Sequence, residues 1–506
     1  MNLAKNILAN WGAHIVTMLV GFFLVPYMLS TIGEAGYGVW VFLNSIVGYS
    51  GLMYLGFGAT TCRFVAHYRA REEWDRLNQT VSSVAFVYVC TGSIIMLLAA
   101  GLAMGAGWID RWGDVPLADI RMAILLLGIN MSIGMIGSVY GGVLHAVQRF
   151  DLYSGIQVTT ALVRLGLTVA FLQARHGVVT LAAIFLTVTV IENVLTAILA
   201  YRQISGLAIR PRHVNRSALK ECFGFSLFNF FRQMSTQMIY FTDTVVIGFM
   251  LGARAVVPYY IGQRLSQMIQ TPLEKVGDVV LPGAGEHHAH GNAEGLHQLL
   301  AKMIGLTLLL AGGFFIGSIY FGGLLITTWT GMDDPASHLV MVILVGSQVV
   351  AAPLLMLKQA LFAAGRVRAT SLIDFAEALV NLGLSLLLIR WWGVIGVAWG
   401  TAIPLVLIEC CVLLPYAVHS LKLDARRLLK EAVLPQLPPL TALLVYCEAI
   451  SRLTLSPGWG HLLAITAGGG VALGAVWLMI TPYRPWRRAA AAVGQGHPQS
   501  VPVKAG

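Results

Sequence analysis

The chain has 506 residues, of which 57% are hydrophobic and only 11% are charged. A soluble globular protein carries about 25% charged residues, so most of this surface must face lipid rather than water. The net charge of +10 does not indicate nucleic acid, because the basic residues form short clusters between long apolar runs.

Apolar runs of about 20 residues, the length that crosses a bilayer as a helix, occur along the whole chain. The sequence predicts an all-α polytopic membrane protein with about fourteen transmembrane helices. The predicted spans cover residues 8–30, 38–60, 81–106, 121–145, 154–173, 177–200, 222–250, 256–283, 299–329, 337–363, 370–389, 394–419, 432–452 and 459–481.

Lysine and arginine are distributed unevenly between the predicted loops. With the N-terminus in the cytoplasm, the cytoplasmic loops and tails hold 23 of the 33 basic residues, and the external loops hold six. The positive-inside rule therefore predicts a multi-pass membrane protein with both termini in the cytoplasm. The external loops are too short to form a soluble domain, and no GxxxxGK[ST] phosphate-binding loop is present.

Two blocks of six spans repeat each other at an offset of about 217–219 residues. Near the start of each block, the matched pairs are Asn10 with Asn229, His14 with Gln233, Thr17 with Thr236, Phe22 with Phe241 and Gly33 with Gly252. Further along, the matched pairs include Leu144 with Leu361, Arg149 with Arg366 and Glu192 with Glu409, and a slip of one residue aligns Gly177 with Gly393.

This duplication predicts two halves of the same orientation around a central cavity. The predicted parts are an N-terminal six-helix lobe (1–205), a C-terminal six-helix lobe (206–420), two further helices (421–481) and a cytoplasmic tail (482–506). We expect the matched glutamates, Glu192 and Glu409, to lie near a membrane boundary or to have a structural role.

Three stretches near the start of the chain carry a family resemblance. They are Asn6–Asn10, the run from Leu29 to Trp40 (LSTIGEAGYGVW), and Leu55–Gly58 leading to Arg63. They resemble the polysaccharide-transporter branch of the multidrug/oligosaccharidyl-lipid/polysaccharide exporter superfamily, which includes O-antigen and exopolysaccharide flippases. The resemblance implies transport of a polyprenyl-diphosphate-linked glycan among the lipids of the bacterial inner membrane. We expect no cofactor. It is compatible with a glycan polymerase and export machinery as further partners.

Polar residues inside the spans are the candidate substrate-binding residues, because such groups usually face a cavity or a partner at membrane depth. Asn10 and His14 share a face of the first span, and Asn229, Gln233 and Gln237 share a face of the seventh. Alternatively, these side chains only bond helix to helix.

Charged residues in the second half extend this set of candidates. Arg232 and Arg264 could hold a diphosphate, since a guanidinium stays charged and binds phosphate oxygens bidentately. Alternatively, each arginine neutralises a neighbouring carboxylate such as Asp243. The candidates for binding a coupling ion are His14, Asp243, Asp374 and Glu377.

The histidine-rich segment from Glu286 to His290, with Glu294 and His297, resembles a metal site, but its short cytoplasmic setting favours a solvated loop and no metal.

Three functions compete. The first is a flippase that moves lipid-linked glycan to the periplasmic face by alternating access. The second is a cation-coupled multidrug exporter, which the basic cavity candidates disfavour. The third is a membrane glycan polymerase or glycosyltransferase, which the short external loops disfavour.

Overall fold

The structure is a computed structural model of the whole chain. It describes the backbone of residues 3–55, 57–108, 112–453 and 456–480. The described side chains exclude, in addition, those of residues 3–10, 59, 224–233, 235–236, 239–240 and 278–279.

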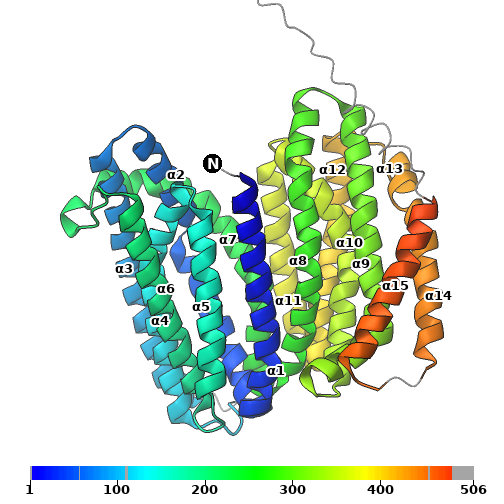
Figure 1. Cartoon of the computed structure of the whole chain (residues 1–506), viewed down its shortest axis with the longest axis horizontal. Coiled ribbons are helices and arrows are strands. Elements are labelled where there is room, and N and C mark those ends of the chain that lie inside the picture. The colour runs from blue at the N-terminus through cyan, green and yellow to red at the C-terminus, as the bar shows by residue number, and fades with distance from the viewer. Residues whose placement is uncertain (1–2, 56, 109–111, 454–455, 481–506) are drawn as a thin grey trace, which may run out of the picture. The chain divides into compact units, whose positions relative to one another are not determined.

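The described residues form helices and connecting turns and contain no β-strand (Figure 1). The predicted all-α fold is confirmed. The first half comprises α1 (Leu3–Tyr49), the 3₁₀ helix η1 (Ser50–Tyr54), α2 (Phe57–Ala70), α3 (Trp74–Gly105), η2 (Ala106–Trp108), α4 (Leu117–Ala146), α5 (Phe150–Phe171), α6 (Gly177–Gln203) and η3 (Pro211–His213).

The second half is similarly helical. It comprises α7 (Arg216–Leu251), α8 (Ala253–Ala289), α9 (Ala293–Thr330), α10 (Pro335–Ala363), α11 (Val367–Ile408), a π-helical turn η4 (Glu409–Leu413) and α12 (Leu414–Ser420). The chain then forms α13 (Ala425–Ala432), η5 (Leu434–Gln436), α14 (Leu437–Ser451) and α15 (Trp459–Ile480).

In the described part of the chain, ten helical segments are long and apolar enough to cross a membrane. Two of them, Trp11–Tyr54 and Val367–Ser420, are each long enough for two spans, and α1 and α11 kink at Gly33 and Gly393. Dividing these two segments at their kinks gives twelve spans. The more polar helices α7 and α8, of 36 and 37 residues, bring the number to fourteen.

The internal repeat is visible in the backbone. Five residues with positive φ in the first half have positive-φ partners in the second: Gly33 with Gly252, Glu72 with Gly291, Gly113 with Gly331, Gln148 with Gly365, and His176 with Gly393. All five pairs fall within the range of offsets at which the sequence repeats. The backbone pairs Gly393 with His176, one position before the Gly177 with which the sequence aligns it.

The chain packs into two compact units. The first contains Met1–Ser266, Ile326–Leu344 and Arg368–Ile408, and the second contains Gln267–Leu325, Val345–Val367 and Glu409–Gly506. These units do not coincide with the two repeats. The four-part division that the duplication predicts stays a prediction.

In the first unit, α3, α4 and α6 lie side by side (Figure 1). The contact between α4 and α6 is very close at Gly137, where an added Cβ would overlap the Asn193 side-chain amide. Small residues allow such close approach between membrane helices. This contact fixes α6, which carries part of the site described below.

The segment after α6 is fastened to α3 by hydrogen bonds. Asn78 donates to the Gly206 carbonyl oxygen at 2.9 Å and accepts from the Ala208 N–H at 2.8 Å. The hydroxyls of Ser82 and Ser83 accept from the N–H groups of Arg210 and Asn215. The connection between the two halves is therefore part of the first unit's packed structure.

Two short helices lie where the sequence predicted a span end or a loop. The predicted second span, 38–60, ends at Tyr54, and α2 follows with Val65 and Tyr68 buried. Helix α13 is capped by Asp424, whose carboxylate accepts from the N–H groups of Arg426 and Arg427. The hydrogen bond from the Arg427 N–H holds the pKa of Asp424 below its usual range.

In the second unit, α14 packs beside α15, in orange and red in Figure 1. Leu443 and Cys447 of α14 cluster with Phe321 of α9. Next to them, Tyr320 donates a hydrogen bond to the Glu448 carboxylate at 3.0 Å. These contacts attach the last two spans to α9.

Candidate functional site

A polar cavity of about 610 Å³ lies within the first unit. Five helices line it: both arms of α1, then α5, α6, α7 and α8. Its polar lining residues are His14, Thr17, Tyr37, Asn44, Ser45, Gln157, Thr160, Arg164, Glu192, Tyr260 and Arg264. Elements of both sequence repeats therefore contribute to one cavity.

Arg264 lies on α8 and lines this cavity, as the sequence prediction of a binding residue requires. Its guanidinium lies against Gly21 of α1, where an added Cβ would be 2.8 Å from Nη2. The Nε atom is buried and has no hydrogen-bond partner among the described residues. The alternative, neutralisation by Asp243, does not describe this arginine, because Asp243 accepts hydrogen bonds from hydroxyl groups instead.

A second arginine, Arg164 of α5, lines the same cavity. Its guanidinium carbon lies 4.4 Å from the ring centroid of Phe185 on α6, an arrangement that favours a cation over an aromatic face. Its Nε atom is also buried without a hydrogen-bond partner in the described part of the chain. With Glu192 as the acidic lining residue, the two arginines give the described lining a formal charge of +1.

Of the predicted polar stripes, the structure describes only some side chains. His14 and Thr17 line the cavity, and the Thr17 hydroxyl donates to the backbone carbonyls of Ala13 and His14. Gln237 is half-buried and does not line it. Four further predicted side chains lie outside the described residues: those of Asn10, Asn229, Arg232 and Gln233.

Asp243, a coupling-ion candidate, is fully buried in a hydrogen-bonded network rather than in the cavity wall. Its carboxylate accepts from Tyr259, from Thr401 at 2.6 Å and from Ser385 at 3.4 Å. Such donors compensate the burial of a carboxylate. The network joins α7, α8 and α11 within the first unit.

The other acidic candidates, Asp374 and Glu377, lie on α11, with Glu377 buried and Asp374 half-buried. Neither lines the polar cavity. Among the four coupling-ion candidates, His14 is the one in its lining. The role of each stays a prediction.

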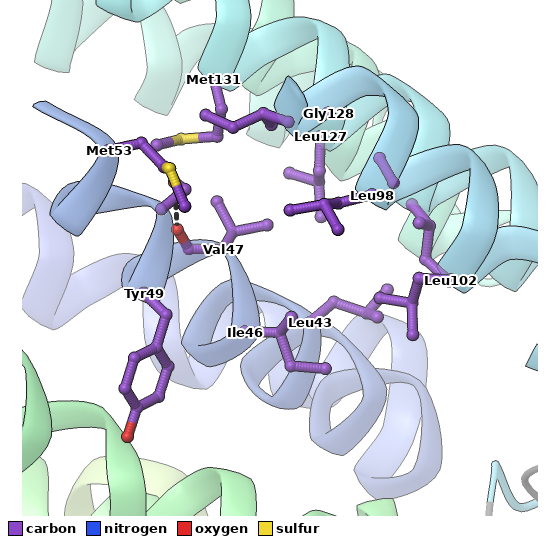
Figure 2. A pocket seen from close by; sticks show the side chains of 14 residues that line it. Leu43, Ile46, Val47, Tyr49, Met53, Leu98, Leu102, Leu127, Gly128 and Met131 are labelled. Carbon is purple, nitrogen blue, oxygen red and sulfur yellow. Dashed lines mark hydrogen bonds between the residues drawn. The ribbon is translucent and has the colours of Figure 1, made fainter. Parts of the chain in front are cut away.

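A second, apolar cavity of about 210 Å³ lies between the second arm of α1, α3 and α4 (Figure 2). Figure 2 shows Leu98, Leu102 and Leu127 facing Ile46 and Val47 across it. A cavity with this lining offers almost no hydrogen-bonding groups. It cannot hold a diphosphate.

A third cavity, of about 570 Å³, lies beside the Gly33 kink within α1. Its lining includes two ion pairs: Arg254 with Asp114, at 2.8 Å, and His176 with Asp119, at 2.8 Å. Arg254 begins α8 and Asp114 precedes α4, so the first pair joins elements of the two repeats within the first unit. Both of its side chains are well exposed.

The predicted solvated loop at Glu286–His297 is largely helical. His287 and His288 end α8, and Glu294 begins α9. The candidate ligands have other partners: Glu294 pairs with Arg427 at 2.6 Å, and His297 contacts Glu431 at 3.1 Å. In the described part of the chain, no three such side chains are placed to hold a metal ion.

Arg164 and Glu192 were not among the site residues predicted from the sequence. Both are ionisable residues inside predicted spans, and that position is itself a signal of function. In the repeat alignment Arg164 is simply the counterpart of Asn381. Glu192 was expected near a membrane boundary or in a structural role, whereas the structure places it in the cavity wall.

The helices and the central polar cavity define the class of a multi-pass membrane transporter, and solved structures share the fold. The chain superposes on a lipid II flippase, MurJ, in an inward closed conformation with a TM-score of 0.72 at 14% identity, covering 96% of this chain and 99% of that one. It superposes on an inward-facing multidrug resistance MATE family transporter with a TM-score of 0.62 at 15% identity, covering 80% and 99%.

The chain belongs to the polysaccharide biosynthesis protein family, whose model matches residues 3–288. It is 22% identical over 476 residues to the "Uncharacterized membrane protein EpsK" of Bacillus subtilis (strain 168), covering 92% of each chain. It is 20% identical over 410 residues to the "Putative O-antigen transporter" of Shigella flexneri, covering 80% of this chain and 96% of that one. The predicted superfamily branch, and a transporter rather than an enzyme, are confirmed.

Proposed function

We propose that this protein moves a polyprenyl-diphosphate-linked oligosaccharide, an O-antigen or exopolysaccharide repeat unit, from the cytoplasmic to the periplasmic face of the inner membrane. The observation that carries the proposal is the placement of two arginines in one polar cavity inside a membrane fold. The family match and the described functions of the flippase and O-antigen transporter relatives support it.

Arg164 and Arg264 suit the diphosphate of such a lipid. A guanidinium keeps its charge at membrane depth and binds two phosphate oxygens at once. Both Nε atoms are buried without hydrogen-bond partners among described residues, so they can donate to an incoming anion. A cavity of about 610 Å³ would take the diphosphate and the adjoining sugar, while the polyprenyl chain stays in the bilayer.

The two repeats suggest how the substrate would cross. Elements of both line the cavity, so rocking of one repeat against the other would expose it alternately to the two faces of the membrane. The basic bias of the predicted cytoplasmic loops supports both termini in the cytoplasm. A glycan polymerase on the periplasmic side would use the product.

Multidrug export is the competing function. A cationic drug would meet a lining with formal charge +1, which repels it. The flippase proposal does not have this conflict. Transport assays can separate the two directly.

The test uses cells depleted of the protein and then complemented with variants. Depletion should leave lipid-linked glycan on the cytoplasmic face of the inner membrane. Arg264→Ala and Arg164→Ala should each lower glycan delivery at least about tenfold, the loss expected when a charge-assisted phosphate contact is removed. Arg232→Ala is tested beside them, since its side chain lies outside the described residues.

The matched control is Arg212→Ala, which removes an exposed arginine of the segment after α6. It should leave delivery unchanged, and membrane levels of all variants should be equal. If both cavity variants deliver glycan normally, the diphosphate site is wrong. If depletion leaves glycan unpolymerised on the periplasmic face, the protein is not the flippase.

A further inference from the structure

The two repeats carry one glutamate at matched positions, and its surroundings differ between them. Glu192 follows the positive-φ residue His176 at the same sequence interval at which Glu409 follows its counterpart, Gly393. The backbone therefore places these two carboxylates at equivalent points of the duplicated fold. Their environments can be compared residue by residue.

Glu409 is neutralised by a direct ion pair. Its Oε1 atom lies 2.8 Å from the Nζ atom of Lys358 on α10, and the two side chains are 3% and 19% exposed. A buried carboxylate is stable at membrane depth when it is paired in this way. Lys358 therefore balances the charge of Glu409 directly.

The first repeat lacks that lysine. Lys358 lies five residues before the end of α10 at Ala363, and the equivalent position of α4, five residues before Ala146, is Gly141. One turn earlier on the same face, Gly137 packs against the side chain that follows Glu192 in the sequence. The helix that supplies the ammonium group in the second repeat thus offers only a glycine at that position in the first.

Arg164 interacts electrostatically with Glu192 but does not form the direct ion pair that Lys358 forms with Glu409. Its guanidinium is held over Phe185, which precedes Glu192 by seven residues, about 10 Å along the axis of α6. The described residues place no ammonium or guanidinium nitrogen within 4.0 Å of the Glu192 carboxylate. This carboxylate instead lines the polar cavity, in common with both arginines.

We propose that Glu192 is a proton-binding site of the cavity, and that its protonation controls how tightly the cavity holds an anionic diphosphate. A carboxylate without a direct ion pair is costly at membrane depth, and taking up a proton lowers that cost. The inference rests on the proposed function for its ligand. A proton is the cation that fits, since it needs only this one carboxylate.

Protonation changes the formal charge of the described lining from +1 to +2, because it removes the one acidic charge beside two arginines. The diphosphate should then bind more tightly at low pH. Binding is reciprocal, so the diphosphate should in turn favour proton uptake. Release of the substrate and release of the proton are thereby linked.

Other ionisable groups face Glu192 from neighbouring elements. Arg164, Tyr54 and Tyr153 interact electrostatically with it, and arginine and tyrosine side chains ordinarily titrate well above neutral pH. Two tyrosines and Arg264, from α1 and α8, also line the cavity. His14 also lines the cavity, and histidine is the side chain that ordinarily changes charge near neutral pH, so it needs its own control.

The test measures binding of farnesyl diphosphate to the purified full-length protein in detergent, at about pH 5.5 and about pH 8. The variants are Glu192→Gln, His14→Gln and the double variant Lys358→Met with Glu409→Gln. The probe's own titration affects all of them alike, so the ratio of each variant's affinity to that of the unmodified protein is the quantity read.

Glu192→Gln should bind about tenfold more tightly than the unmodified protein at the higher pH, from the one unit of charge removed, and equally at the lower pH. For the double variant, the ratio should be the same at both pH values, whatever its size. A contribution of His14 would instead appear in His14→Gln as weaker binding at the lower pH and unchanged binding at the higher pH. A Glu192→Gln ratio that does not change with pH would overturn the inference.

A second measurement needs no ligand. Infrared difference spectra of the protein between the two pH values should show a protonated-carboxyl band that is weaker in Glu192→Gln and unchanged in the double variant. If the unmodified protein lacks this band, or Glu192→Gln keeps it in full, Glu192 is not a proton site. If the band is found but no variant binds the diphosphate, the proton site stands and the proposed substrate fails.

Discussion

Helix α6 of the first repeat places Glu192 in the wall of a polar cavity. In the second repeat the matched Glu409 forms an ion pair with Lys358 instead. The same contrast holds for Arg164, whose counterpart is the buried Asn381. Residues with positive φ recur at five matched pairs of positions, but the environments of the matched glutamates are not repeated. The two repeats thus share a similar backbone but differ in their intramembrane charged side chains.

The difference shows which constraints act on each repeat. A residue with positive φ is needed where one helix ends or kinks and the next begins, and the fold requires these points in both repeats. An intramembrane charge is costly and persists only where it has a partner or a task. In the second repeat the glutamate is paired with a lysine, and in the first we propose that it binds a proton.

The largest effect is expected when Lys358, the partner of Glu409, is replaced. Lys358→Met should leave Glu409 buried without its ammonium group and lower the free energy of unfolding by about 3–5 kcal/mol. The midpoint of thermal unfolding in detergent measures this loss. The double variant with Glu409→Gln should recover most of the stability, and equal midpoints for single and double variants would show that the ion pair is not what keeps Glu409 stable.

The shared backbone can be tested at Gly33 and Gly252, whose φ/ψ values are 71°/172° and 95°/167°. This region is almost restricted to glycine, so Gly33→Ala and Gly252→Ala should each cost about 1–3 kcal/mol. The same thermal assay applies. Gly166→Ala is the control, because Gly166 is helical with nothing within 4 Å of an added Cβ.

For Gly33 and Gly252, similar losses are the expected result. A loss at only one of them would mean that the two reversals do not have equal structural weight. Gly166→Ala should be neutral or slightly stabilising, since alanine is the better helix former.

The smallest effect is expected for the exposed pair of Arg254 and Asp114, whose side chains are 64% and 83% exposed. Arg254→Ala should change the free energy of unfolding by less than about 1 kcal/mol. Its loss should also become smaller at high salt, because exposed charges are screened. A loss as large as that of Lys358→Met would remove the distinction between exposed and buried pairs.

The sequence predicted the spans well because length and apolarity decide them. It predicted the first span's end near Gly33, and the non-helical backbone of Gly33 divides α1 into two arms there. It placed residues 61–80 between two spans because of basic residues such as Arg63 and Arg69. In the structure, much of this stretch is α2, where Val65 and Tyr68 are buried.

The candidate site was predictable only in part. Arg264 and His14 stood out as polar residues in apolar runs, and both line the cavity. Arg164 and Glu192 gave the same signal, but which helix faces which cavity depends on long-range packing, such as the close approach of α4 and α6. A repeat alignment treats Glu192 and Glu409 as equivalent, and only the neighbouring helix, with glycine in one copy and lysine in the other, distinguishes them.

The spacing of the matched positive-φ residues also shows where the two repeats differ in length. From Glu72 to Gly113 and from Gly113 to Gln148 the first copy is one residue longer than the second, and from Gln148 to His176 the two are equal. Helices α4 and α10 show one of these changes, at 30 and 29 residues. A single-residue loss turns the rest of a helix by about 100°, so it can present new side chains to old neighbours in one evolutionary step.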